Sequence, residues 1–425
     1  MGKTITEKIL SKAAGKDVSP GEYIDLSSRL GFTMTFGLLS RGPDMLQEVG
    51  ATRLFNPNLV HVVDGHNGST ASHNAGEDRS RGRAWFKKMG VPDENIYELG
   101  RSGVEHVQAG ENAWCVPGEV FFQAVNGHTT TLGALGGFAV TLSFGSWSYL
   151  ATGKTWARVP ESVKIVANGK LPHGVYARDV TEYVLGQIGP SAAVGKVMEW
   201  TGPIVDDLSM EGRFTICCNA LFFGAWTAIM NPDRKCIDYV KARNPIDFEP
   251  LVSDSDAKYC KVYEFDLSHI VPQIVPPPER YHVFPVSQHE SKPINRGFIG
   301  TCANGRIEDL RVAAQILKGR KIHSDVILNI TPGTPAILKQ AVQEGLMEIF
   351  IDAECAVHYP SCGQCRGANT PLGAGDVCVA TATCNYAGRM GSKEAQIYLA
   401  SPATTAASAI EGKITDPRRY LQGGE

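Results

Sequence analysis

The stretch GFIGTCANGRIEDLRVAAQILKGRK, residues 297–321, contains a strand, a loop and a helix in direct succession. The short apolar run Arg296–Gly300 is typical of a buried strand. After the loop, apolar residues recur at helical spacing, at Leu310, Ala313, Ala314 and Leu317. A strand followed at once by an amphipathic helix is the first half of a βαβ unit, which favours a parallel sheet covered by helices.

Further units of the same kind follow this stretch. Residues 325–330, DVILNI, predict a second buried strand. Thr334 with Pro335 predicts the start of a helix, and Gly345 predicts its end. Residues 346–353, LMEIFIDA, are interpreted as the next strand. The C-terminal part of the chain is therefore expected to be an α/β domain.

Upstream of this domain, the sequence suggests two further units. Residues 162–169, SVKIVANG, predict a strand that begins a new unit, and the Pro-rich segment 272–293 is interpreted as a linker. The fold class expected is α/β. The chain is expected to form three α/β/α domains, at about 1–160, 161–283 and 284–425.

Bulk composition excludes several classes of protein. The 425 residues carry a net charge of −3 and show no basic cluster, so nucleic acid is not an expected partner. Residues 1–17 lack the apolar core of a signal peptide. The uncharged segment 127–153 is too rich in Gly, Ser and Thr for a membrane span, and a buried helix with flanking loops is expected there. The 11 cysteines do not suggest a disulfide framework, so we expect reduced thiols and a cytoplasmic protein.

Three cysteines stand where α/β proteins place their sites. Cys302 lies between a strand and a helix, and Cys362 and Cys365 form a CxxC pair in YPSCGQCRG. Such a pair serves zinc, disulfide exchange or an iron–sulfur cluster, and buried structural thiols are a further alternative. Zinc usually needs a second CxxC, which the sequence lacks. Three thiols suit a cluster in which one iron has no cysteine ligand and acts as a Lewis acid.

The segments around these cysteines resemble the cluster-binding segments of the aconitase superfamily. Further motifs occur in the family's order, among them GRSGVEH, VPGEV, NGHTTTLGALGGF, GKLPHGV, NYAGRMG and YLASPATTAASAIEGKI. The likeness is greatest to the free-standing large subunits of the isopropylmalate dehydratase type. It implies a 4Fe–4S cluster on Cys302, Cys362 and Cys365 and a hydro-lyase acting on a small hydroxy acid. It also implies a separate small subunit that carries a swivelling domain and the serine base.

The resemblance also implies roles for polar side chains. His106 in GVEH and His128 in NGHT match family histidines that orient the leaving hydroxyl and carry protons. His66 in VDGHN corresponds more loosely, with Asp64 expected as its acidic partner. Arg389 in NYAGRMG aligns with an arginine that binds a substrate carboxylate. Without the resemblance, hydrogen-bonded core positions would be the favoured interpretation of all three histidines.

Several positions depart from the family pattern. Asn126 replaces an acid and Cys384 replaces a carboxylate-binding arginine, and both are expected to contact substrate. Three further replacements are Gly127 for a serine, Cys218 for an asparagine and Phe222 for a glutamate. These changes make the pocket less polar. We therefore expect a hydroxy acid that is less polar than citrate or isopropylmalate. Two alternatives stay open: a different cluster-dependent reaction that uses Cys384, and a non-catalytic relative that senses iron or oxygen or binds a partner.

Overall fold

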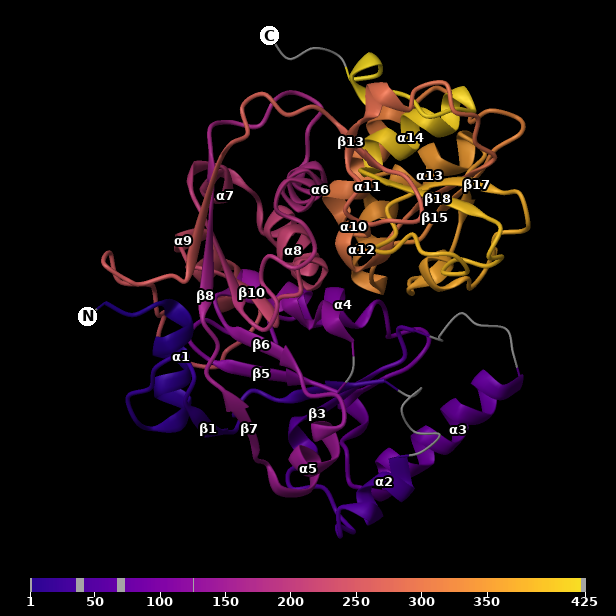
Figure 1. Cartoon of the computed structure of the whole chain (residues 1–425). Coiled ribbons are helices and arrows are strands. Elements are labelled where there is room, and N and C mark those ends of the chain that lie inside the picture. Colours follow the sequence, from indigo (N-terminus) through magenta and orange to yellow (C-terminus); the bar gives the residue numbers. More distant parts are fainter. Residues whose placement is uncertain (1, 36–41, 67–72, 125, 422–425) are drawn as a thin grey trace.

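The computed structural model describes residues 2–35, 42–66, 73–124 and 126–421 (Figure 1). Two all-parallel sheets come first along the chain. The five-stranded sheet has the order β4 (Ile96–Tyr97), β3 (Val60–Val63), β2 (Phe32–Met34), β5 (Val120–Gln123) and β6 (Phe138–Thr141). The four-stranded sheet has the order β10 (Thr227–Met230), β9 (Val197–Thr201), β8 (Ser162–Asn168) and β11 (Lys261–Asp266). A separate antiparallel pair joins β1 (Tyr23–Leu26) to β7 (Thr155–Arg158).

The third sheet has seven strands and contains the stretch that opened the sequence analysis. Its order is β13 (Phe284–Pro285), β12 (Gln273–Val275), β18 (Gln396–Ala400), β17 (Val377–Ala380), β14 (Arg296–Ile299), β15 (Ile327–Ile330) and β16 (Ala356–Val357). The strands from β18 to β16 are parallel, and β12 is antiparallel to both of its neighbours. After β14, the chain adds β15 and β16 on one side of this strand and then β17 and β18 on the other side. Such a reversal leaves a crevice beyond the carboxyl ends of the strands.

Helices connect and cover these strands. The α-helices are α1 (Ile5–Ala14), α2 (Gly42–Glu48), α3 (His73–Lys88), α4 (Glu105–Glu111), α5 (Gly145–Thr152), α6 (Ala177–Ile188), α7 (Pro203–Asp207), α8 (Met210–Cys218), α9 (Arg234–Lys241), α10 (Thr301–Asn304), α11 (Ile307–Leu317), α12 (Pro335–Gln343), α13 (Leu346–Asp352) and α14 (Pro402–Glu411). The expected helix after β14 is confirmed as α11. The predicted start at Pro335 is also confirmed, because the Thr334 hydroxyl accepts a hydrogen bond from the Ile337 amide at 3.2 Å.

The strand predicted at residues 346–353 is wrong, because this segment forms α13. Leu346, Met347 and Phe350 are buried, while Ile351 is exposed. This is the three-to-four-residue spacing of a helix rather than the alternation of a strand. Gly345, with φ 73°, separates α12 from α13 and so lets one helix follow another without an intervening strand.

Two other expectations about segments are corrected by the structure. The proposed linker at 272–293 supplies β12 and β13, with Ile274 and Val275 completely buried against β18. The segment 127–153 is a 3₁₀ segment, η4 (Gly127–Leu135), followed by β6 and α5, rather than one buried helix. The strands β12 and β13 have only three and two residues, too few to show the alternation of a strand. The prolines beside them suggest a loop, which explains the linker prediction.

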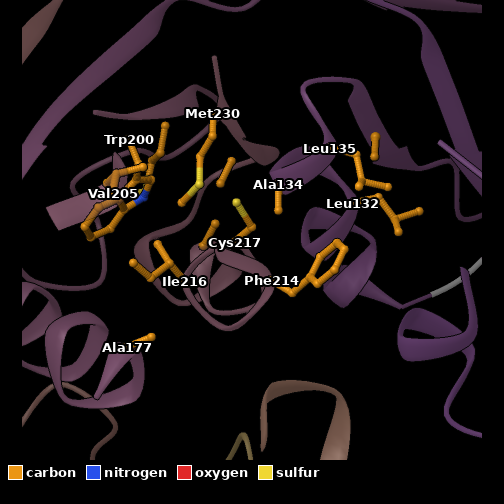
Figure 2. Close-up of a cluster of buried hydrophobic side chains, with 14 of the residues drawn as sticks. Leu132, Ala134, Leu135, Ala177, Trp200, Val205, Phe214, Ile216, Cys217 and Met230 are labelled. Carbon is orange, nitrogen blue, oxygen red and sulfur yellow. The ribbon is translucent and has the colours of Figure 1, made fainter. Parts of the chain in front are cut away.

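The largest apolar core joins the first two units (Figure 2). Leu132 and Leu135 of η4 belong to the same cluster as Phe214 of α8 and Met230 of β10. The backbones also come very close here, because a Cβ on Gly133 would lie 1.7 Å from the Ala228 carbonyl oxygen. Only glycine allows this approach. The η4 segment is therefore fixed in position by its own burial.

The strands of the three sheets lie within 32–141, 162–266 and 273–400. The domain limits at about 160 and 283 stay a prediction, and β12 lies before the second of them.

A buried charge network ties α6 to the end of β17. Glu182 of α6 is 1% exposed and pairs with both Arg178 and Arg280. Arg178 also donates to the Ala382 carbonyl oxygen at 2.8 Å, and Arg280 donates to the Thr383 carbonyl oxygen at 2.9 Å. One carboxylate thus compensates two guanidinium groups that hold the segment after β17.

Replacing Glu182 with Ala leaves both guanidinium groups without their counter-charge. Since losing one partner of a buried ion pair costs about 3–5 kcal/mol, the free energy of unfolding should fall by about that amount in urea denaturation followed by circular dichroism. Asp238→Ala is the matched control, because it breaks an exposed pair of the same i,i+4 spacing with Arg234. This control should have no measurable effect. Equal effects of the two substitutions would contradict the role of Glu182.

Candidate active site

Three histidines from separate elements line up at the carboxyl ends of the first sheet. His66 follows β3, His106 is the second residue of α4, and His128 lies in η4. The ring centroids of His66 and His106 are 6.4 Å apart, and those of His106 and His128 are 5.8 Å apart. Burial lowers the pKa of His66 to about 3, and the nearby Arg366 adds to this effect. Burial also lowers the pKa of His106 well below its ordinary value, so both rings are neutral at pH 7.

Asn126 fixes the tautomer of His66. The Asn126 Oδ1 atom accepts a hydrogen bond from the His128 amide at 3.2 Å, so its Nδ2 atom faces His66 Nε2 at 2.8 Å. His66 Nε2 must therefore accept, and the ring proton stands on Nδ1. That Nδ1 atom is buried and has no hydrogen-bond partner within the ranges that the structure describes. The Asn126 amide, predicted to contact substrate, thus already holds two protein groups.

Asp64 has a different partner from the one expected. Its Oδ2 atom lies 3.1 Å from Arg79 Nε, and no hydrogen bond joins Asp64 to His66 within the described ranges. Burial raises the pKa of Asp64 to about 6, although the Arg79 guanidinium opposes this shift. A catalytic role for Asp64 stays a prediction.

The predicted cluster cysteines lie at the carboxyl ends of the third sheet. Cys302 is in α10, directly after β14, and Cys362 and Cys365 follow β16, with Cys365 inside η7 (Gly363–Arg366). All three are free thiols. Thr301 adopts φ 81°, which is strained for a β-branched residue and is a feature that clusters at functional sites.

The two sets of residues meet because the two sheets face each other through backbone contacts. The Cys362 amide donates to the Gly65 carbonyl oxygen at 3.0 Å, and the Val104 amide donates to the Gly333 carbonyl oxygen at 2.7 Å. These hydrogen bonds join the segments after β3 and β4 to the loops after β15 and β16. The thiol loops are therefore held directly against the segment that carries His66.

Arg389 lies beside Cys365, as expected for a side chain at the same site. Its Nη2 atom is 3.5 Å from Cys365 Sγ, and its Nη1 atom donates to the Tyr386 hydroxyl at 3.2 Å. Its Nε atom is buried without a partner in the part of the chain that the structure describes. Burial opposes ionisation of Cys365, but the Arg389 guanidinium outweighs it and lowers the pKa of the thiol. Burial raises the pKa of Cys362 to about 12, and the Cys365 thiol adds to this shift.

The altered positions give the site an apolar wall. The centroid of the Phe222 ring lies 5.9 Å from that of the His128 ring. The Arg280 guanidinium lies over the Phe222 ring, 4.4 Å from its centroid. Cys384 Sγ is 3.8 Å from the Thr383 hydroxyl. Burial raises the pKa of Cys384, so it is a neutral thiol at pH 7 and a weak nucleophile.

Two site residues were not assigned a role from the sequence. Glu105 is fully buried beside His106, and burial raises its pKa to about 8, although Thr33 and Gln123 oppose the shift. The signal was present in GVEH, where an acid directly precedes a predicted catalytic histidine. Arg280 lay inside the segment interpreted as a linker, so nothing in the local sequence indicated its contact with Phe222.

Comparisons with known proteins identify relatives along nearly the whole chain. The sequence model of the aconitase family (aconitate hydratase) matches residues 60–295 and 280–412. The 3-isopropylmalate dehydratase large subunit 1 of Methanopyrus kandleri is 39% identical over 99% of this chain and 100% of its own length. The 3-isopropylmalate dehydratase large subunit of Aquifex aeolicus is 40% identical over 99% of this chain and 98% of its own length. The probable methanogen homoaconitase large subunit of Methanothermobacter thermautotrophicus is 36% identical over 99% of both chains.

The fold and these relatives thus identify an α/β enzyme of the hydro-lyase class. The chain belongs to the aconitase family. The predicted fold class and enzyme class are confirmed, and membership of this family implies a 4Fe–4S cluster. In the described part of the chain, no helix is both long and apolar enough to cross a membrane.

Replacing Glu105 with Gln tests whether this acid is buried in its neutral form. The folded-state pKa of about 8 exceeds the ordinary 4.5, so the folded protein holds the proton more tightly than the unfolded chain. The resulting stability is complete below pH 4.5 and is lost as the pH rises to about 8. Relative to the wild type, Glu105→Gln should therefore gain about 3–5 kcal/mol in unfolding free energy between about pH 5 and pH 9, measured by urea denaturation.

The control is Glu344→Gln, because Arg311 lowers the pKa of Glu344 to about 2 and the carboxylate stays charged throughout this pH range. Its difference from the wild type should not vary between about pH 5 and pH 9. A flat difference for Glu105→Gln would show that Glu105 is ionised in the folded protein.

Proposed function

We propose that this chain is the cluster-bearing large subunit of a hydro-lyase that adds or removes water at a small hydroxy acid. The observation that carries the proposal is that Cys302, Cys362 and Cys365 lie close to the three histidines of the site and to Arg389. Three free thiols at strand ends fit an iron–sulfur cluster, because proteins hold such clusters through cysteine thiolates. Bound there, a 4Fe–4S cluster with one iron free of cysteine would supply a Lewis acid for the substrate hydroxyl.

In this proposal, the histidines donate hydrogen bonds to the leaving hydroxyl. His66 is neutral and has its proton on Nδ1, so it can donate a hydrogen bond without changing charge. His106 is also neutral, and the protonated Glu105 beside it supplies no negative charge. This differs from the usual pairing of a histidine with a carboxylate, which favours the imidazolium form. Donation from neutral rings supports departure of a hydroxyl that is already polarised.

Arg389 binds a substrate carboxylate through its unpartnered Nε atom and its adjacent Nη atoms. Arg280, by contrast, is engaged by Glu182, by the Thr383 carbonyl oxygen and by Asn219 Oδ1. With Cys384 at the place of a second arginine and Phe222 beside His128, the site offers an apolar wall. A hydroxy acid with one carboxylate fewer than citrate, or with a larger apolar substituent, matches this surface.

A separate small subunit completes the enzyme in this proposal. The relatives compared above are named large subunits, and burial lowers the pKa of His66 and His106, so both rings are weak bases. The base that removes the proton next to the carboxylate would therefore come from the partner, as a serine on its swivelling domain. The partners are thus a small subunit and a hydroxy acid, in the reducing cytoplasm that free thiols and a labile cluster require.

The test is turnover by the anaerobically purified chain, co-expressed with a small subunit, on a panel of monocarboxylic and dicarboxylic hydroxy acids. We expect hydration or dehydration of at least one acid, with kcat/KM higher for acids with fewer carboxylates. Arg389→Ala should reduce kcat/KM by about 10- to 100-fold, mainly through KM, because it removes a charge-assisted hydrogen bond to substrate.

Lys393→Ala is the control, since it removes the same charge from an exposed residue of the same segment and should leave the kinetics unchanged. A preference for isopropylmalate or citrate would contradict the proposed substrate class while leaving the reaction intact. No turnover of any acid by a protein with a full complement of iron would contradict the reaction itself.

A further inference from the structure

A fourth thiol lies beside the predicted cluster ligands. Cys218, the last residue of α8, is completely buried, and its Sγ atom is 3.4 Å from Cys302 Sγ. His128 Nδ1 is 3.5 Å from the same Cys218 sulfur. One ligand atom from each of Cys218, Cys302 and His128 lies within 4.8 Å of the other two. We refer to these three residues as the Cys–Cys–His trio.

The spacing of the trio suits one metal ion. In a tetrahedral zinc site the metal–sulfur distance is about 2.3 Å, which places two thiolate sulfurs about 3.8 Å apart. The observed sulfur–sulfur distance of 3.4 Å is close to this value, so small side-chain movements bring both thiols onto one ion. Two cysteines and one histidine with an open fourth position is a ligand set that protein zinc sites use.

The groups behind the trio hold it in place without an ion. His128 Nδ1 is also 3.0 Å from the Cys218 carbonyl oxygen, which keeps the ring beside Cys218, and an ion bound at Nδ1 replaces this contact. Arg306 Nη1 donates to the Cys302 carbonyl oxygen at 2.9 Å. The Thr215 hydroxyl donates to the Ala303 carbonyl oxygen at 2.6 Å and ties α8 to α10. The two helices that carry the thiols are thus already joined.

We propose that in the cluster-free chain the Cys–Cys–His trio binds a single thiophilic divalent cation of the Zn²⁺ type. On binding, two S–H protons pass to solvent as two metal–sulfur bonds form, and no electron is transferred. The two thiolates neutralise the ion, so the buried site carries no net charge. Cys302 belongs both to the trio and to the predicted cluster ligands, so the ion and a complete cluster exclude each other. This inference goes beyond the proposed function, because it makes a zinc-type ion a competitor of cluster assembly at Cys302.

Cobalt binding to the cluster-free full-length chain under anaerobic, reducing conditions tests the inference, because tetrahedral thiolate-bound Co²⁺ absorbs strongly in the visible range. The wild type should bind one Co²⁺ per chain, and Zn²⁺ should displace it. Cys218→Ala removes a ligand and should weaken binding more than about 100-fold, since loss of an outer-shell partner alone costs about 10- to 100-fold. Cys217→Ala, which removes the neighbouring core thiol, should leave binding unchanged.

A second pair of variants separates this site from the cluster site. Cys362→Ser with Cys365→Ser should abolish cluster assembly and retain the cobalt spectrum. If those variants lose cobalt, or if Cys218→Ala keeps it, the trio is not the site. X-ray absorption of the zinc-loaded wild type needs no variant: two sulfur ligands at about 2.3 Å and at least one nitrogen at about 2.0 Å are expected. A shell of three or more sulfurs would overturn the assignment.

Discussion

The arrangement of the site depends on the ion network around Glu182. This buried carboxylate compensates Arg178 and Arg280, and both guanidinium groups donate to carbonyl oxygens of the segment that leaves β17. That segment continues into Cys384 and Arg389, while Arg280 also packs on Phe222 next to His128. A single acid on α6 therefore holds the segment after β17, and Arg280 connects it to Phe222 beside His128. Two buried cations without that acid would be unfavourable, so the network sets one relative position of these elements.

The site forms where the carboxyl ends of two parallel sheets meet. The first sheet contributes the three histidines, and the third contributes thiols and Arg389. Backbone hydrogen bonds from Cys362 to Gly65 and from Val104 to Gly333 join the two ends. Burial keeps His66, His106 and Glu105 uncharged, whereas burial of His128 is outweighed by the neighbouring Cys218, which raises the pKa of that histidine. A site built in this way can favour a carboxylate at one end and an apolar substituent at the other.

Much of this could be predicted from the sequence, and the failures have physical causes. The helix 307–317 and the positions of Cys302, Cys362 and Cys365 followed from strand, loop and helix patterns and from the family resemblance. The segment 346–352 was mistaken for a strand because a short apolar run fits either period. The strand β12 and the contacts of Arg280 depend on β18 and Glu182, which are distant in sequence. The pairing of Asp64 with Arg79, the burial of Glu105 and the contact between Cys218 and Cys302 are likewise tertiary, so no local pattern indicates them.

In the proposed enzyme, Cys302, Cys362 and Cys365 hold a cluster with one iron open to substrate. The most direct measurement is electron paramagnetic resonance of the iron-loaded, anaerobically purified protein, before and after mild oxidation and with added hydroxy acids. We expect a three-iron signal after oxidation that disappears when ferrous iron is restored, and a reduced four-iron signal that changes with an acid. A cluster that survives oxidation with all four irons and responds to no acid would contradict this proposal, and would indicate that Cys218 or another thiol closes the fourth position.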